Sequence, residues 1–147
     1  MLTLEKIPGK GRGIISTEMI PQKTVIEKAP AVAFPSEQLE GLRKTEIWQY
    51  CFVRPTEYNT QKNCARGYLI FGLSSLANHS EHPNTKIEWH EDDSGFRAEL
   101  VAIQDIQPGE EVTMYYTNIN DYSEDALPLT RKEKASQYQT YTFDLEI

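Results

Sequence analysis

Residues 78–84 carry the densest group of chemically capable side chains in the chain, with the sequence Asn-His-Ser-Glu-His-Pro-Asn. Amide groups donate and accept hydrogen bonds, whereas a neutral imidazole can also bind a metal ion or exchange a proton near neutral pH. This density of polar groups around a proline indicates a binding site, either for a ligand or for a metal ion.

A metal site is the first interpretation to weigh, because His79 and His82 are three residues apart and His90 follows nearby. Zinc sites usually need three or four ligands at recognisable spacing, and Cys51 and Cys64 form no Cys-x-x-Cys pair. A neutral histidine with satisfied hydrogen bonds is the more common outcome. We therefore expect no metal site.

Two further segments have unusual composition: residues 9–13 read Gly-Lys-Gly-Arg-Gly, and residues 109–116 read Gly-Glu-Glu-Val-Thr-Met-Tyr-Tyr. Glycine-rich loops let the backbone approach a ligand closely and direct N–H groups toward it. The first segment is neither a dinucleotide fingerprint nor a phosphate loop, because β-branched residues rather than a helix follow it. Taken alone, it also fits a flexible hairpin turn, and Tyr115 and Tyr116 also fit half-buried strand aromatics.

These three segments, in this order across residues 3–122, resemble the SET-domain protein lysine methyltransferases. In that family a Gly-x-Gly turn contacts S-adenosylmethionine through its main chain. The resemblance further implies that the Asn78 amide accepts a hydrogen bond from the ammonium group of the cofactor, that the His79 backbone meets its adenine, and that Asn84 is structural. The cofactor-binding residues that it implies are Lys10, Gly11, Arg12, Gly13, Asn78 and His79.

The resemblance also implies a catalytic residue and a substrate channel. Tyr116 falls on the position of the catalytic aromatic hydroxyl of the family. Tyr115 is a departure, because that position often holds aspartate or a small residue, so the pocket wall differs. Tyr50 and Tyr122 match the other channel walls of small single-domain members. The implied reaction moves a methyl group from S-adenosylmethionine to the ε-amine of a protein lysine and leaves S-adenosylhomocysteine.

Many members of the family close the site with a zinc-bound cysteine segment after the catalytic tyrosine, but no cysteine follows Cys64 here. The resemblance therefore implies no structural zinc. Closure then depends on Tyr122, on aromatic residues of the tail, or on a second subunit in a homodimer. A non-catalytic SET-like domain that binds or scaffolds peptides is the alternative function, and methylation of a small-molecule amine would leave the same motifs.

The elements that must position these residues are mostly short strands, which we expect at 13–17, 24–27, 68–71 and 111–115, with a hairpin formed by 86–90 and 96–101. Residues 36–51 have the apolar spacing of a helix with Ser36 as its N-cap, and residues 54–66 are typical of a loop. The expected class is mainly β. With the resemblance, it becomes a SET-domain fold of several small sheets with a pseudoknot and a short helical insert.

The chain has 147 residues and 39% hydrophobic residues, which fits one globular domain. We expect the SET domain at 1–125, with a helical and loop insert at 36–67. The tail at 126–147 either covers the site or lies outside it.

The formal net charge of −7 disfavours direct contact with nucleic acid and favours a basic partner, such as a lysine-containing protein or peptide. The first residues show no signal-peptide pattern, and no stretch approaches the ~18 apolar residues of a membrane span. We therefore expect a soluble intracellular protein without a membrane partner. Cytoplasm, nucleus and secretion as an effector remain open as its final location.

Overall fold

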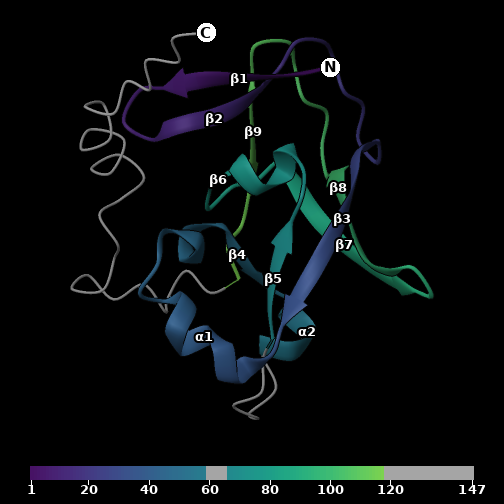
Figure 1. Ribbon diagram of the computed structural model, residues 1–147. Coiled ribbons are helices and arrows are strands. Elements are labelled where there is room, and N and C mark those ends of the chain that lie inside the picture. The colour runs from purple at the N-terminus through teal and green to yellow at the C-terminus, as the bar shows by residue number, and fades with distance from the viewer. Residues whose placement is uncertain (59–65, 118–147) are drawn as a thin grey trace, which may run out of the picture.

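The computed structural model describes residues 1–58 and 66–117, which form two sheets (Figure 1). The first sheet contains, in order, β1 (Leu2–Ile7), β2 (Gly11–Ser16), β9 (Glu111–Met114) and β6 (Asn78–His79). The second contains, in order, β4 (Cys51–Val53), β5 (Gly67–Ile70), β3 (Val25–Phe34), β8 (Gly95–Ala102) and β7 (Thr85–Asp92). The predicted mainly β class is confirmed.

Strand β9 joins segments that are far apart in the sequence. It pairs antiparallel with β2 on one side, where Ile14 faces Val112, and parallel with β6 on the other, where Asn78 faces Thr113. Just beyond β6, the Ser80 N–H donates to the carbonyl of Met114 at 2.9 Å. The three segments that the sequence singles out therefore meet in one sheet, as the expected pseudoknot requires.

The main hydrophobic core contains residues from both sheets and packs the two sheets together. Ile14 and Val112 contribute from the first sheet and Leu100 from the second, and all three are at most 1% exposed. Ile20 and Ile106, which form an isolated β-bridge, also belong to the cluster. Burying one such aliphatic side chain stabilises a fold by about 1.5–3 kcal/mol, so this cluster anchors the strands that carry the candidate site.

The helix predicted over 36–51 is wrong in its extent. Helix α1 covers only Ser36–Leu42, and a 3-10 helix, η1 (Glu46–Tyr50), precedes β4. Pro35 is the N-cap and makes no side-chain capping bond, so the prediction of Ser36 as the cap is also wrong. Helix α1 has no fully buried residue, and a helix this short is only marginally stable without strong packing. Thr45 then adopts an extended backbone and ends the helical course.

The other connecting segments are short. The predicted loop at 54–66 includes a helix, α2 (Pro55–Tyr58), and its residues 59–65 lie outside the described part of the chain. A 3-10 helix, η2 (Leu73–Leu76), leads into β6. The predicted hairpin is confirmed: Asp92 pairs with Gly95 at the turn between β7 and β8, and Gly95 has a φ of 111°. The tail at 126–147 and the domain boundary at 125 lie outside the described residues.

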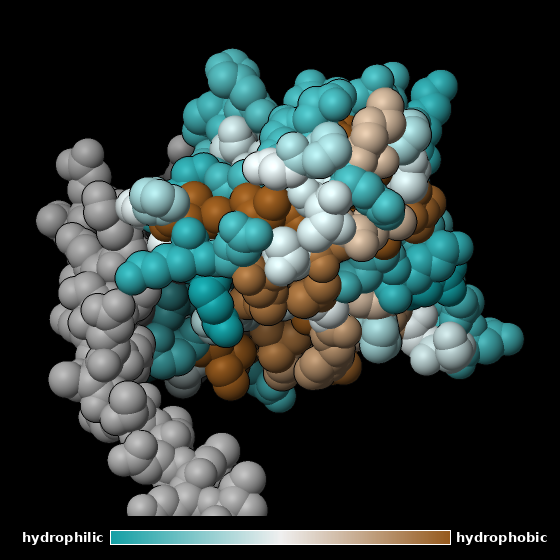
Figure 2. Space-filling view, turned by 90° about the horizontal axis from the view of Figure 1, so that it is seen from above, coloured by the Kyte–Doolittle hydropathy of each residue, from teal (hydrophilic) through white to brown (hydrophobic). Residues whose placement is uncertain are grey.

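The surface divides into apolar and hydrophilic areas. Seen from above, hydrophobic residues gather in a central band that hydrophilic residues border (Figure 2). Exposed large hydrophobic residues at the start of the chain include Met1 and Leu4. Within residues 1–58 and 66–117, no helix combines the length and the apolar character that crossing a membrane requires.

Candidate active site

The glycine turn between β1 and β2 depends on its glycines for two different reasons. Gly9 and Gly11 each have a φ of 79°, a left-handed conformation that residues with a side chain rarely adopt. Gly13 is limited by space, because a Cβ atom there would lie 2.5 Å from Cγ1 of Ile7 and 2.8 Å from Nδ2 of Asn78. The backbone of the turn therefore lies directly against Asn78.

Asn78 connects the glycine turn to β9. Its side chain is buried, and Nδ2 donates to the carbonyl of Arg12 at 3.1 Å and to Oε1 of Glu111 at 2.8 Å. The other oxygen of Glu111 pairs with Nζ of Lys10 at 2.7 Å. These contacts fix the orientation of the Asn78 amide and join the predicted residues Lys10, Arg12 and Asn78 through Glu111.

Asn84 binds the backbone of β9, as its expected structural role requires. The residue is 3% exposed, its Nδ2 donates to the carbonyl of Glu111 at 2.8 Å, and its Oδ1 accepts from the Thr113 N–H at 2.9 Å. Thr85 Oγ1 donates to the carbonyl of Thr113 at 2.7 Å. Because buried amides pay a high cost when they lack partners, this satisfied network specifies the position of β9.

His79 and Tyr116 contact one another directly. The Tyr116 N–H donates to Nδ1 of His79 at 3.0 Å, and the two ring centroids lie 5.3 Å apart. An accepting Nδ1 carries no hydrogen, so Nε2 carries it and donates to Oε1 of Glu81 at 3.0 Å. The Tyr116 hydroxyl donates to the carbonyl of Ala77 at 2.8 Å. Tyr116 is therefore held at its backbone by His79 and at its hydroxyl by Ala77.

A cavity of about 280 Å³ lies beside Tyr116. Among the residues that line it are Phe52, Ile87, Trp89, Tyr115 and Tyr116, so its walls are largely aromatic and aliphatic. None of the described residues that line the cavity is an aspartate or a glutamate. This cavity can enclose an apolar stem, and Tyr116 forms part of its wall.

Comparison with known proteins agrees with this arrangement. The sequence model of the SET domain matches residues 11–117. The chain belongs to the SET-domain family. It is 31% identical over 107 residues to a Schizosaccharomyces pombe protein named histone-lysine N-methyltransferase, H3 lysine-37 specific, a match that covers 73% of this chain and 67% of that protein.

The fold has a counterpart among solved structures. It matches the crystal structure of a Plasmodium falciparum protein provisionally assigned as a histone methyltransferase, with a TM-score of 0.59 and 25% identity. The match covers 78% of this chain and 91% of that one. The SET-domain fold predicted from three short segments is confirmed, and the expected enzyme class, a protein-lysine N-methyltransferase, agrees with the names of both relatives.

The predicted channel residues of the SET domain differ in their placement. Tyr115 and Tyr116 line the cavity. Tyr50 ends η1 and is not among the lining residues, whereas its neighbours Gln49 and Cys51 are. Tyr122 lies outside the described residues.

Two residues of the site carry contacts that the sequence patterns did not indicate. Glu111 binds both Lys10 and Asn78, and the only sign of it was a pair of acids after Gly109. The side chain of His79 holds the backbone of Tyr116, although the resemblance assigned a role only to the backbone of His79.

The cavity wall also contains Cys51, which is buried. Burial raises the pKa of the Cys51 thiol to about 11. The thiol is therefore protonated at neutral pH, and it adds an apolar surface rather than a nucleophile to the wall.

Proposed function

We propose that this SET domain transfers a methyl group from S-adenosylmethionine to the ε-amine of a lysine in a histone or another basic protein. The observation that carries the proposal is the position of Tyr116. This residue belongs to the wall of the cavity and also contacts His79, next to Asn78 and the glycine turn. The names of the two relatives support a lysine-containing protein as the class of substrate.

The residues that would hold the cofactor are Lys10, Gly11, Arg12, Gly13, Asn78 and His79. Bound S-adenosylmethionine supplies an electrophilic methyl group on a positively charged sulfur. The fit is supported by the left-handed Gly11, by the lack of space for a side chain at Gly13, and by the buried amide of Asn78. The glycine backbone and the oriented amide of Asn78 are suited to binding the polar end of a small ligand.

Tyr116 is the proposed catalytic residue, and its contacts define what it can do. Its hydroxyl hydrogen is directed to the carbonyl of Ala77, so the phenol offers its oxygen to an incoming amine as an acceptor. An amine that donates one N–H to this oxygen has its lone pair fixed in direction. Holding a nucleophile in a reactive orientation is a large source of rate enhancement.

The amine must also lose its proton, because free lysine has a pKa of ~10.4. The cavity favours this loss, since Phe52, Ile87 and Trp89 replace the water that stabilises an ammonium ion. The lining also lacks an acidic side chain among its described residues, so nothing there pairs with the positive charge. The proton then leaves through water, and no dedicated base is needed.

Labelled S-adenosylmethionine tests the proposed function directly. The purified chain is incubated with histones, ribosomal proteins and free amines, and the position of the label is mapped by mass spectrometry. We expect label on lysine ε-amines of basic proteins, because the chain has a net charge of −7. Binding of the cofactor without any transfer would instead favour a non-catalytic peptide-binding domain.

The proposed homodimer needs its own measurement. Sedimentation velocity at the assay concentration should show a species of two subunits if a second copy closes the site. A fully active monomer would exclude that role for dimerisation.

A further inference from the structure

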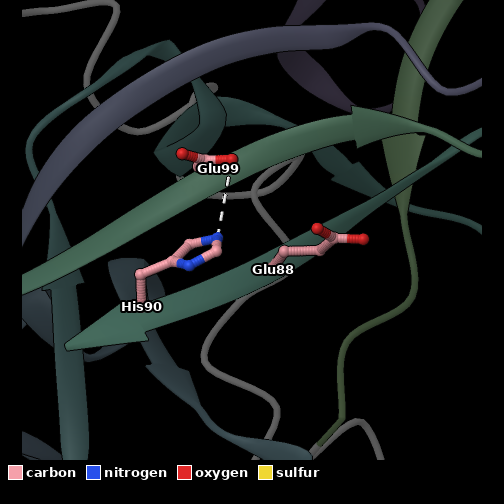
Figure 3. Close-up of side chains that lie close together, drawn as sticks. All are labelled: Glu88, His90 and Glu99. Carbon is pink, nitrogen blue, oxygen red and sulfur yellow. Dashed lines mark ion pairs between the residues drawn. The ribbon is translucent and has the colours of Figure 1, made fainter.

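The β7–β8 hairpin carries a second cluster of chemically capable side chains, formed by Glu88, His90 and Glu99 (Figure 3). Glu88 and Glu99 are direct partners across the two strands, and His90 lies two residues from Glu88, so all three project from the same face of the hairpin. Ile87 and Trp89 alternate with them and line the cavity. None of the three cluster residues lines the cavity, although Lys86, which shares their face of β7 and pairs with Glu88, does.

The imidazole of His90 is directed across the strands toward Glu99 (Figure 3). The His90 side chain is 40% exposed, but its Nε2 atom is buried and makes no hydrogen bond, although it lies 3.5 Å from Oε2 of Glu99. Buried polar atoms without a partner are uncommon in folded proteins. A tetrahedral zinc ion, with bonds of ~2.0–2.1 Å to nitrogen and oxygen, separates two of its ligand atoms by ~3.3–3.4 Å. The 3.5 Å between Nε2 of His90 and Oε2 of Glu99 is therefore longer than an ordinary hydrogen bond and close to the distance between two ligand atoms of one zinc ion.

The carboxylate of Glu99 is held in position by its other oxygen. Lys28 lies 3.4 Å and Arg97 3.3 Å from Oε1, whereas His90 faces Oε2. Partners of this kind orient a ligating carboxylate without occupying its metal-binding oxygen. The Lys28 side chain is 63% exposed and Arg97 also pairs with Asp92, so both cations can keep their contacts while an ion lies on the Oε2 side.

Glu88 completes the cluster. One ligand atom from each of the three residues lies within 4.8 Å of the other two. The side chain of Glu88 is 43% exposed and pairs with Lys86 at 2.8 Å, an exposed ion pair of the kind that contributes little stability. It can therefore move closer to His90 at low cost. Glu88 and Glu99 also repel one another as directly opposed like charges, which a bound cation would relieve.

We propose that Glu88, His90 and Glu99 bind one divalent transition-metal ion, with zinc the preferred ion, and that water fills the remaining position. One imidazole and two carboxylates suit zinc and its neighbours, whereas magnesium and calcium prefer oxygen ligands alone. The ion would join β7 to β8 and stabilise the strand that brings Ile87 and Trp89 to the cavity. This differs from the sequence analysis, which weighed His79, His82 and His90 as possible ligands and expected no metal site.

Zinc titration of the full chain tests the site. After treatment with a chelator, calorimetry with zinc chloride should show one ion bound per chain, and cobalt(II) should give the visible absorption of a tetrahedral centre. His90→Ala should weaken zinc binding at least tenfold, and Glu88→Gln several-fold. His82→Ala is the matched control, because His82 is an exposed histidine outside the cluster and its loss should change nothing.

Thermal unfolding gives an independent readout. Zinc should raise the unfolding temperature of the wild type and of His82→Ala by several degrees, but not that of His90→Ala, and magnesium should have no effect. Absence of stoichiometric zinc binding to the wild type would overturn the proposal, as would binding that persists equally in His90→Ala and Glu88→Gln. Circular dichroism confirms that each variant is folded. Neither measurement depends on methyl transfer, so the outcome is separate from that of the proposed function.

Discussion

The two sheets of this SET domain use polar side chains in different ways. In the first sheet, buried amides join segments that are distant in the sequence: Asn78 binds Arg12 and Glu111, and Asn84 binds β9. On the β7–β8 hairpin of the second sheet, the polar contacts include exposed ion pairs, such as Lys86 with Glu88 within β7 and Arg97 of β8 with Asp92 of β7. Buried hydrogen bonds are costly to break, whereas exposed ion pairs contribute little. Substitutions should therefore have larger effects around β9 than on the hairpin.

The largest effect is expected at Tyr116. Tyr116→Phe removes the oxygen that orients the amine and leaves the ring in place, so single-turnover methyl transfer should fall by about 10²–10³-fold. Cofactor affinity, measured by calorimetry, should stay nearly constant. Tyr115→Phe is the matched control, because Tyr115 lines the same cavity but makes no comparable contact with the Ala77 carbonyl. Equal losses in both variants would contradict the proposed role of Tyr116.

Gly13→Ala tests whether the close approach of the glycine turn matters. The added methyl group would meet Ile7, Asn78 and Glu111 at 3.0 Å or less, so the free energy of unfolding should fall by about 1–3 kcal/mol. Gly41→Ala is the control, since no atom lies within 4 Å of its Cβ position in helix α1. That variant should be unchanged or stabilised by up to ~1 kcal/mol. Urea unfolding measures the stability of both variants. If Gly13→Ala is as stable as Gly41→Ala, the close approach at Gly13 does not matter for stability.

Asn78→Ala should weaken the binding of S-adenosylmethionine by roughly 1–3 kcal/mol, because it removes an oriented amide and leaves Glu111 without one of its partners. Calorimetry measures this loss. Glu88→Gln should leave cofactor affinity unaltered, because Glu88 is neither a proposed cofactor-binding residue nor a lining residue of the cavity. If Asn78→Ala binds S-adenosylmethionine as tightly as the wild type, the Asn78 amide is not part of the cofactor site.

The smallest effect is expected from Glu57, which connects α2 to the second sheet. Burial raises the pKa of Glu57, but hydrogen bonds from Tyr68 and Arg66 outweigh it, so the net pKa lies below the ordinary value of 4.5. A lowered pKa stabilises the fold above the pKa of the unfolded chain, and this contribution is lost as the pH falls through the pKa of the folded state. Between pH 7 and pH 3, Glu57→Gln should therefore lose slightly less stability than the wild type. Identical pH profiles would show that the contact is not stabilising.

The sequence indicated features of this fold that are local or carried by motifs. The β7–β8 hairpin was predictable because its strands alternate around a short turn, and the segments 9–13, 78–84 and 109–116 were recognisable by composition and order. Helix 36–51 was predicted too long, because apolar spacing alone did not reveal that α1 has no fully buried residue.

Other features depend on pairing between distant strands, which local patterns do not contain. Glu111 reaches Asn78 only because β9 lies between β2 and β6. The same pairing brings the His79 side chain to the backbone of Tyr116. The cluster of Glu88, His90 and Glu99 likewise needs the register of the hairpin, which places Glu88 opposite Glu99.

A crystal structure of the chain with S-adenosylhomocysteine and a lysine peptide tests the central claim most directly. The account predicts that the product contacts the glycine turn, Asn78 and His79, and that a lysine side chain enters the cavity with its nitrogen beside the Tyr116 hydroxyl. Binding of the product away from these residues, or a lysine that lies outside the cavity, would contradict it.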